Sequence, residues 1–136
     1  MRCCRSASNG ADGYCVQAKA ALTVKNSSAT ASMNHGFGVM TGGKLVLKEC
    51  QAGGSNGHGL HAINEGSVLE GETCTVQGNV GSGVLMCSSA VGVLRGCRSF
   101  SNGGYGYGAQ AQAMLTLSYS SADGNCLLYT SPSPRD

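Results

Sequence analysis

The sequence has little of what most soluble domains use to build and solubilise a core. Its 136 residues include no tryptophan, 5% aromatic residues and 12% charged residues. The charged fraction is about half of ordinary usage, and the formal net charge of +2 gives no overall electrostatic basis for binding nucleic acid or a membrane. Apolar runs near the ~20 residues of a membrane span are also absent, and Met1 is not followed by a signal-peptide core. We therefore expect no membrane partner.

Glycine, by contrast, is abundant, with 22 residues. High glycine with few charges is also typical of flexible linkers, but here the apolar residues recur in short regular runs, which a disordered segment lacks. One sequence segment occurs in two similar copies: residues 97–107 read CRSFSNGGYGY and residues 4–14 read CRSASNGADGY, with eight of eleven residues identical. Such repetition in a short chain indicates one domain of stacked units, or a piece of one.

The repeat has a period of 23 residues. Successive units open with a glycine, and these glycines follow one another at steps of 23, 23, 24 and 23 residues. We expect the extra residue of the third unit in the stretch VLEGETC, before Cys74, where a β-bulge would accommodate it. The opening glycines are Gly13, Gly36, Gly59, Gly83 and Gly106.

Each unit contains three short stretches with the period of two that indicates a strand with one buried face. The first follows the opening glycine, the second holds an alternating aliphatic pair, and the third begins at a column of cysteine and serine. Units end in turn sequences such as GSNGH and SNGGY, where we expect Asn and Gly to supply positive φ angles. The expected inward positions are Tyr14, Val16, Phe37, Val39, Leu60, Ala62, Val84, Met86, Tyr107 and Ala109 in the first stretch, Leu22, Val24, Leu45, Leu47, Leu115 and Leu117 in the second, and Cys4, Ser27, Cys50, Cys74, Cys97 and Ser120 in the cysteine column.

Three short strands per unit cannot bury a core alone, but stacking pairs each strand with its copy in the next unit. This pattern resembles the right-handed parallel β-helix of the pectate-lyase-like superfamily over nearly all of residues 3–125. We therefore predict an all-β solenoid of about five coils. Leucine-rich repeats share the period but need an L-x-x-L-x-L line with asparagine, and left-handed β-helices need a hexapeptide period; neither occurs here.

The last eleven residues, CLLYTSPSPRD, break the pattern and contain both prolines of the chain. They resemble one reading frame of a sequencing-library adapter, so we assign residues 1–125 to the repeats and residues 126–136 to a non-native or disordered tail. The alternative is a natural tail with a proline-directed phosphorylation site. Met1 falls within a repeat, so we expect a piece of a longer β-helix, cut at both ends.

Cysteine recurs in consecutive coils at Cys50, Cys74 and Cys97. A structural zinc site needs four ligands in a tetrahedron, which a straight inward row of three cannot supply. We interpret the column as small buried thiols, with serine at the equivalent position of other units. The remaining cysteines, Cys3, Cys15 and Cys87, show no paired spacing, and unpaired thiols favour a reducing, intracellular compartment.

The column that closes each unit is a second candidate site, because two stacked imidazoles beside a carboxylate can bind a metal or move a proton. The alternative, which we favour, is a row of solvent-facing turn residues, since the sequence shows no residue that would orient the imidazoles. We therefore predict no metal or other cofactor. The column reads Asp12, His35, His58, Ser82 and Tyr105, with His61 nearby, and its candidate metal ligands are His35, His58 and Asp12.

Enzymes of the superfamily that the repeat resembles place clustered carboxylates, or calcium-bound carboxylates with a basic residue, on one outer strand face. Asp12 and Asp123 stand almost five coils apart, which is more than ~20 Å, whereas glycosidase carboxylates lie ~5–9.5 Å apart. The Arg-containing lyase motifs of the superfamily are not found, so we predict no catalytic residue in this stretch. The glutamates occupy different columns: Glu49, Glu65, Glu70 and Glu72.

The position two before the cysteine column is the most patterned charge feature. It is basic in most coils, and the position after the cysteine adds two arginines; alternation with the inward cysteine points both outward. Such a row suits an anionic polymer, a uronate or sulfated glycan, whereas nucleic acid is disfavoured because no aromatics interleave. The alternative is a solvated face. The candidate binding residues are Lys25, Lys48, Glu72, Arg95, Arg98 and Arg5.

Together these patterns predict a non-catalytic β-helix module that binds carbohydrate, such as an acidic polysaccharide, or protein along a lateral face. One alternative is a fragment of a polysaccharide lyase, hydrolase or epimerase whose active site lies in other coils. Another is an intracellular scaffold, as in the β-helix repeats that accompany F-box proteins. A carboxylate cluster in further coils would favour the enzyme, and a signal peptide would argue against the scaffold.

Overall fold

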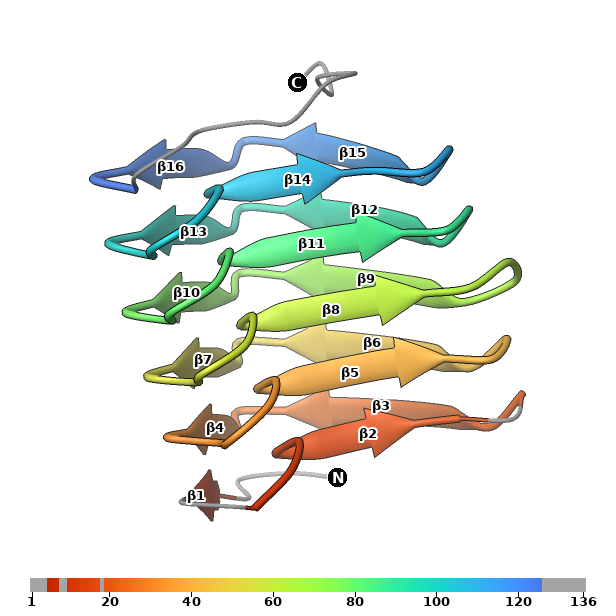
Figure 1. Ribbon diagram of the computed structural model, residues 1–136, viewed down its shortest axis with the longest axis horizontal. Helices are drawn as coiled ribbons and strands as arrows, with labels where there is room; N and C mark the ends of the chain where they lie inside the picture. The colour runs from red at the N-terminus through yellow and green to blue at the C-terminus, as the bar shows by residue number, and fades with distance from the viewer. Residues whose placement is uncertain (1–4, 8–9, 18, 126–136) are drawn as a thin grey trace.

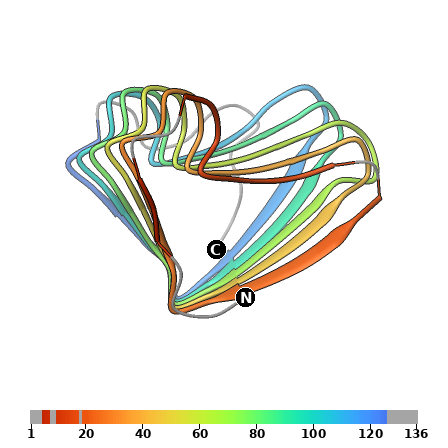
Figure 2. The same ribbon diagram turned by 90° about the horizontal axis from the view of Figure 1, so that it is seen from below.

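The computed structural model describes residues 5–7, 10–17 and 19–125, which form strands and turns but no helix. The strands make three parallel sheets, stacked coil upon coil (Figure 1). Seen along the stack, the coils superimpose on a three-sided outline (Figure 2). The predicted all-β parallel solenoid of about five coils is therefore confirmed. The expected tail and Cys4 lie outside the described residues.

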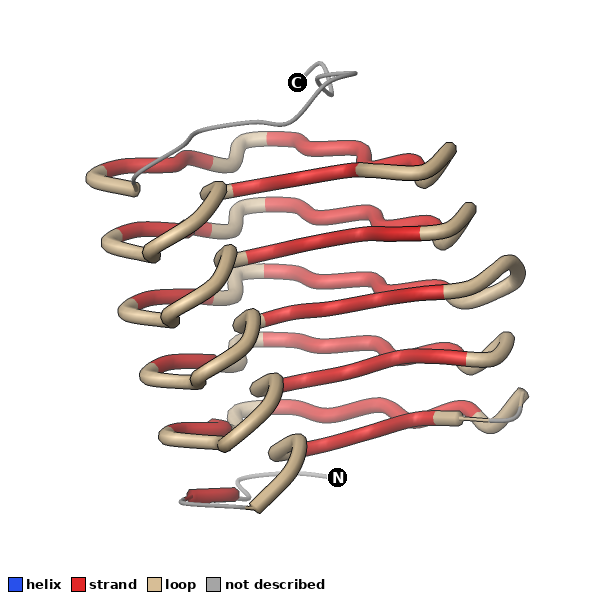
Figure 3. The backbone as a smooth tube through the Cα atoms, viewed as in Figure 1, coloured by secondary structure: helices blue, strands red, loops and turns tan. Residues whose placement is uncertain are grey.

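We label the three sheets A, B and C. Each coil runs through them in the same order, first sheet C, then sheet A and then sheet B, with turns at the corners (Figure 3). Sheet C consists of β2 (Tyr14–Val16), β5 (Phe37–Met40), β8 (Leu60–Ile63), β11 (Val84–Cys87) and β14 (Tyr107–Ala109). Sheet A consists of β3 (Ala21–Lys25), β6 (Lys44–Lys48), β9 (Val68–Glu72), β12 (Val91–Arg95) and β15 (Met114–Ser118). Sheet B consists of β1 (Arg5–Ala7), β4 (Ser28–Thr30), β7 (Gln51–Gly53), β10 (Thr75–Gln77), β13 (Arg98–Phe100) and β16 (Ser121–Asp123).

The extra residue of the third unit lies in a corner turn, so its predicted position before Cys74 is wrong. Strand β9 pairs with β6 without interruption from Val68 to Glu72, and four residues, 64–67, join β8 to β9 where three join β5 to β6. Ser67 secures the longer turn: its hydroxyl donates to Ile63 O at 2.7 Å and accepts from Gly42 N at 3.0 Å. An inserted residue in a turn preserves every ladder bond, whereas a bulge would disrupt them.

The core is a set of inward columns, as the alternation predicts. The aliphatic pair of sheet A is buried in the second coil, where Leu45 and Leu47 have no exposed surface. Rings stack along the axis in sheet C, where the centroids of Tyr14 and Phe37 lie 4.9 Å apart. Tyr107 is fully buried, and its hydroxyl donor lies within hydrogen-bond distance of two carbonyl oxygens, 3.1 Å from Cys97 O and 2.9 Å from Ser121 O, so this polar atom is satisfied inside the core.

The opening glycines are explained by close approach between coils. A Cβ at Gly36 would lie 2.8 Å from Gly59 O, which is nearer than a carbon can approach without backbone movement. The left-handed backbone needed at corners lies elsewhere, for example at Thr73 (φ 54°) and Gly96 (φ 64°) in the turn between sheets A and B. In the turn SNGGY it is Ser101 (φ 55°) that has positive φ. Our expectation that Asn supplies the positive φ there is therefore wrong.

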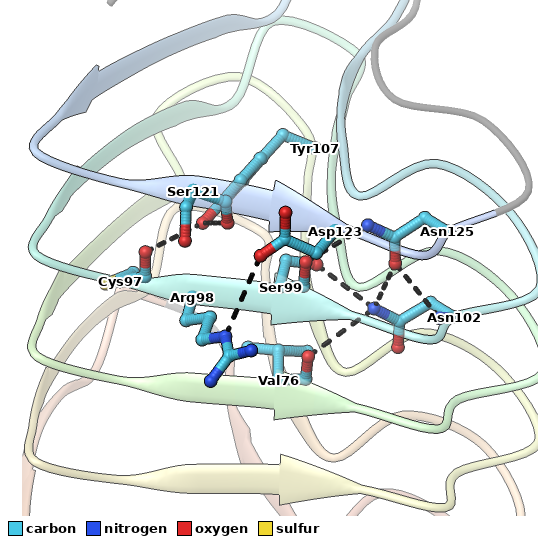
Figure 4. A network of polar contacts seen from close by, with 9 residues as sticks. All are labelled: Val76, Cys97, Arg98, Ser99, Asn102, Tyr107, Ser121, Asp123 and Asn125. Carbon is cyan, nitrogen blue, oxygen red and sulfur yellow. Dashed lines mark hydrogen bonds and ion pairs between the residues drawn. The ribbon is translucent and has the colours of Figure 1, made fainter.

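The asparagines of the turn between sheets B and C have a different role. Asn79 and Asn102 are buried, and with Asn125 they form a row of side-chain amides along the axis. Figure 4 shows the contact between Asn102 and Asn125. Each Oδ1 accepts a hydrogen bond from the backbone N–H of the preceding coil, at 3.1 Å for Asn79 N to Asn102 and 2.9 Å for Asn102 N to Asn125. The row therefore satisfies turn amides that the sheets leave unpaired.

Candidate functional site

The predicted basic column lies along one edge of sheet A. Lys25 pairs with Lys48, Lys48 with Glu72 and Glu72 with Arg95, each as the last residue of its strand. Because parallel strands lie ~4.8 Å apart, these residues form a single row along the solenoid axis. We call Lys25, Lys48, Glu72 and Arg95 the basic row. Lys25 is half-buried and the other three side chains are exposed.

Two adjoining depressions follow the basic row. The first has a volume of about 340 Å³, with Val46 and Val93 on its apolar side and Lys48, Glu72 and Arg95 on its charged side. The second has a volume of about 330 Å³ and extends to Lys25. Lys48 and Glu72 line both. The row therefore borders two shallow depressions that share Lys48 and Glu72 and together span several coils, and we call these two depressions the groove.

The cations of the groove are largely free to contact a ligand. Among the described residues, Lys25, Lys48 and Arg95 form no ion pair, whereas Lys44 Nζ lies 3.4 Å from Glu70 Oε2 across the face of sheet A. The guanidinium of Arg95 lies 5.5 Å from the ring centroid of Tyr119 in the next coil. A ligand with both carboxylates and hydroxyls could use the cations for its charges and the glutamates for its hydroxyl donors.

Arg98 points outward as expected, but from sheet B, around the corner from the basic row. Its guanidinium lies 4.4 Å from the ring centroid of Phe100, and its Nε lies 3.9 Å from Asp123 Oδ2 (Figure 4). It lines neither depression. Arg5 belongs to β1 of the same sheet, with a backbone that pairs with Ser28. The structure therefore brings together four of the six candidate residues and sets these two arginines apart.

Three residues that line the first depression were not among the predicted binding residues. Val46, Glu70 and Val93 occupy the outward position two residues before the basic row, and they share one register column. The signal was available in the alternation, because any position two before an outward residue is also outward. It was missed because this column mixes apolar and acidic residues and so lacks a compositional pattern.

In the closing column, the side chains from Asp12 to Ser82 each accept a hydrogen bond from a backbone N–H of the next coil. Asp12 Oδ1 accepts from His35 N at 3.0 Å, and His35 Nδ1 accepts from His58 N at 3.0 Å. His58 Nδ1 accepts from Ser82 N at 2.8 Å, and Ser82 Oγ accepts from Tyr105 N at 3.0 Å. Asp, His and Ser can each occupy this column because each provides a hydrogen-bond acceptor close to the backbone. Both imidazoles therefore carry their proton on Nε2.

His61 of β8 joins the two imidazoles to make a cluster. Ring centroids lie 5.2 Å apart for His35 and His58, 4.3 Å for His35 and His61, and 5.2 Å for His58 and His61. The first pair is nearly parallel, with an interplanar angle of 7°, so the rings stack instead of converging. No group of three His, Cys, Asp or Glu side chains in the described residues is arranged to hold a metal ion. The geometry fits backbone pairing better than metal binding.

The cysteine column is inward, as predicted. Cys50, Cys74 and Cys97 are at most 2% exposed, and all the described cysteines are free thiols. Each thiol donates to the carbonyl two residues earlier, as Cys97 does to Arg95 O at 3.5 Å. Hydrogen bonding with the thiols of Cys50 and Cys97, together with burial, raises the pKa of Cys74. The middle thiol is therefore kept protonated, and the column serves packing.

The comparisons with known proteins bear on the fold. The family model of the right handed beta helix region matches residues 1–133. No curated protein and no solved structure matches. The described residues contain no helix that is long and apolar enough to cross a membrane. With the stacked parallel sheets and the period of the repeat, the match over nearly the whole chain shows that this protein belongs to the right-handed β-helix family.

Proposed function

We propose that this β-helix is a non-catalytic module that binds an extended anionic carbohydrate along the outer face of sheet A. The observation that carries the proposal is the alignment of Lys25, Lys48 and Arg95 in one register column beside the two depressions of the groove. Cations at the spacing of parallel strands, ~4.8 Å or a multiple of it, can follow the closely spaced charges of a polymer that runs along the axis.

The apolar side of the groove supports a sugar ligand over a compact anion. Val46 and Val93 offer a surface for the C–H face of a pyranose ring, while Lys48 and Arg95 reach a carboxylate or sulfate at its edge. Glu72, between them, is an acceptor for hydroxyl groups. Joint catalysis by the two aspartates is disfavoured because Asp12 and Asp123 lie at opposite ends of the described coils, too far apart to act on one bond.

The test is retention of the full chain on immobilised polygalacturonate at low and high salt. We expect retention at low salt that is lost near 1 M salt, where charges are screened beyond ~3 Å. The Lys25→Glu, Lys48→Glu double variant should lose retention. Lys48→Glu should weaken it far more than Lys19→Glu, which changes the net charge equally but lies in the turn between sheets C and A.

Three outcomes would contradict the proposal. If Lys48→Glu and Lys19→Glu weakened retention equally, the basic row would be an ordinary solvated face without a binding role. Equal retention on a neutral glycan would exclude recognition of the ligand by its charge. Release of shortened or unsaturated sugar products from the polymer would favour the alternative of a polysaccharide-degrading enzyme.

A further inference from the structure

The imidazole cluster lies at the corner between sheets B and C, away from the proposed binding face. His35 and His58 each accept a backbone hydrogen bond from the next coil through Nδ1. Gly57 and Gly81 pack directly over these rings, since a Cβ at either glycine would lie 2.6 Å from Nδ1 of the imidazole in the preceding coil. The rings are therefore half-buried, and the hydrogen bonds that they accept link three consecutive coils.

We propose that this cluster makes the corner acid-sensitive: protonation of the imidazoles at Nδ1 removes the acceptors that tie one coil to the next and places like charges in contact. Nδ1 is the nitrogen that takes up the proton, because Nε2 already carries one. The protonated ring then presents an N–H to the backbone N–H of the next coil, so an attractive contact becomes repulsive.

The surroundings of the cluster favour neutral imidazoles. Burial, followed by the charge of His35, lowers the pKa of His58 to about 4, and burial with the charges of His35 and His58 lowers the pKa of His61 to about 4. Burial also lowers the pKa of His35, against the opposing effect of Asp12.

Few other groups face the cluster. Asp12, in the turn before β2, acts on His35 and His61, and Cys15 of β2 lies beside that carboxylate. In the column of His61, the neighbouring strands β5 and β11 contribute Gly38 and Leu85, neither of which is charged. Asp12 is therefore the one carboxylate that acts on these imidazoles within the described residues.

The sign of the pH effect follows from these shifts. Unfolded histidines bind protons near pH 6.5, whereas folded His58 and His61 do so near pH 4. Between these values the unfolded chain holds more protons, so the free energy of unfolding falls as the pH falls through this window. The contribution is fully present above about pH 6.5 and is lost near pH 4.

The first experiment is an NMR titration of the full chain with ¹⁵N-labelled histidine and backbone amides, from pH 7.5 to 3.5. We expect Nε2–H tautomers of His35 and His58 at neutral pH, and midpoints for His58 and His61 near pH 4, well below that of a free histidine. The amide of Ser82 should lose its hydrogen-exchange protection in the same step. Midpoints near 6.5 with an unchanged Ser82 amide would overturn the proposal.

The second experiment uses a variant that keeps the acceptor but does not titrate. His58→Asn supplies a side-chain Oδ1 as the acceptor for Ser82 N, as Asp12 Oδ1 does for His35 N. His61→Leu introduces the residue that Leu85 provides at the equivalent position of the next coil. In urea unfolding between pH 4 and 6.5, the double variant should take up about two protons fewer on unfolding than the wild type. Identical pH dependence in variant and wild type would contradict the proposal, and the titration of the wild type decides the matter if the variant fails to fold.

Discussion

The side-chain amide of Asn79 donates a hydrogen bond of 2.8 Å to Oδ1 of Asn102, one coil further along the solenoid. Asn102 in turn donates through Nδ2 to Asn125 Oδ1 at 2.8 Å and to Ser99 Oγ at 3.1 Å. The same Oδ1 of Asn102 also accepts from the backbone N–H of Asn79. One buried side chain therefore pairs polar groups on both sides of its own coil, which makes it the centre of the asparagine row.

Asn102→Ala should destabilise the fold by about 2–4 kcal/mol, because it leaves the buried amide of Asn79 without its acceptor. Urea unfolding followed by far-UV circular dichroism measures the loss. Asn125→Ala removes one acceptor of Asn102 and should cost less, since Asn125 is only half-buried and the Asn102 amide keeps Ser99 Oγ as a partner. A loss below about 0.5 kcal/mol for Asn102→Ala would show that the row adds nothing beyond ordinary packing.

Ser55→Asn should stabilise the fold by about 0.5–1 kcal/mol, by extending the asparagine row by one coil. Ser55 occupies the position equivalent to Asn79 and its backbone N–H already donates to Asn79 Oδ1, but its buried hydroxyl has no hydrogen-bond partner. An asparagine amide at this position could reach Asn79 Oδ1. A lower unfolding midpoint in urea would mean that the coil has no room for the larger side chain.

The turn between sheets A and B should respond to residues that tolerate positive φ. Thr73 is β-branched and has φ 54°, whereas Asn26 and Gly96 hold the same position in other coils. Thr73→Asn should therefore gain about 0.5–1 kcal/mol and Gly96→Thr should lose about 1–2 kcal/mol. A Cβ at Gly96 would meet nothing nearer than 3.7 Å, so the loss would come from the backbone alone. Melting temperatures that move together in the two variants would contradict this account.

Serine should replace cysteine in the inward column better than alanine does. Ser27 Oγ donates to Lys25 O at 2.7 Å, which is the same type of bond that Cys74 Sγ makes to Glu72 O at 3.5 Å. Cys74→Ser keeps this bond, whereas Cys74→Ala loses the bond and leaves a small cavity. Thermal unfolding should rank the wild type first, Cys74→Ser second and Cys74→Ala third, and a reversed order of the two variants would sink this explanation.

The sequence predicts the sheets and the inward columns well because stacking imposes the same environment on each copy of a position. Leu45 and Leu47 are buried because their alternation leaves no other choice. Turns follow weaker rules, since several sequences satisfy one corner. The sequence alone could not place the extra residue in the turn 64–67. The acceptor role of His58 could not be predicted either, because it depends on a contact of Nδ1 with the backbone of the next coil. The groove beside Lys48 also depends on three strands that are distant in sequence.

The most direct test of the proposed binding face is a map of amide chemical-shift changes when the ¹⁵N-labelled chain is titrated with oligogalacturonate at low salt. We predict that the largest changes fall at the ends of β3, β6 and β12, on Lys25, Lys48 and Arg95, and that they disappear in the Lys25→Glu, Lys48→Glu variant. Changes centred on sheet B around Arg98, changes centred on the imidazole cluster, or no changes at all would contradict the assignment of the binding face to sheet A.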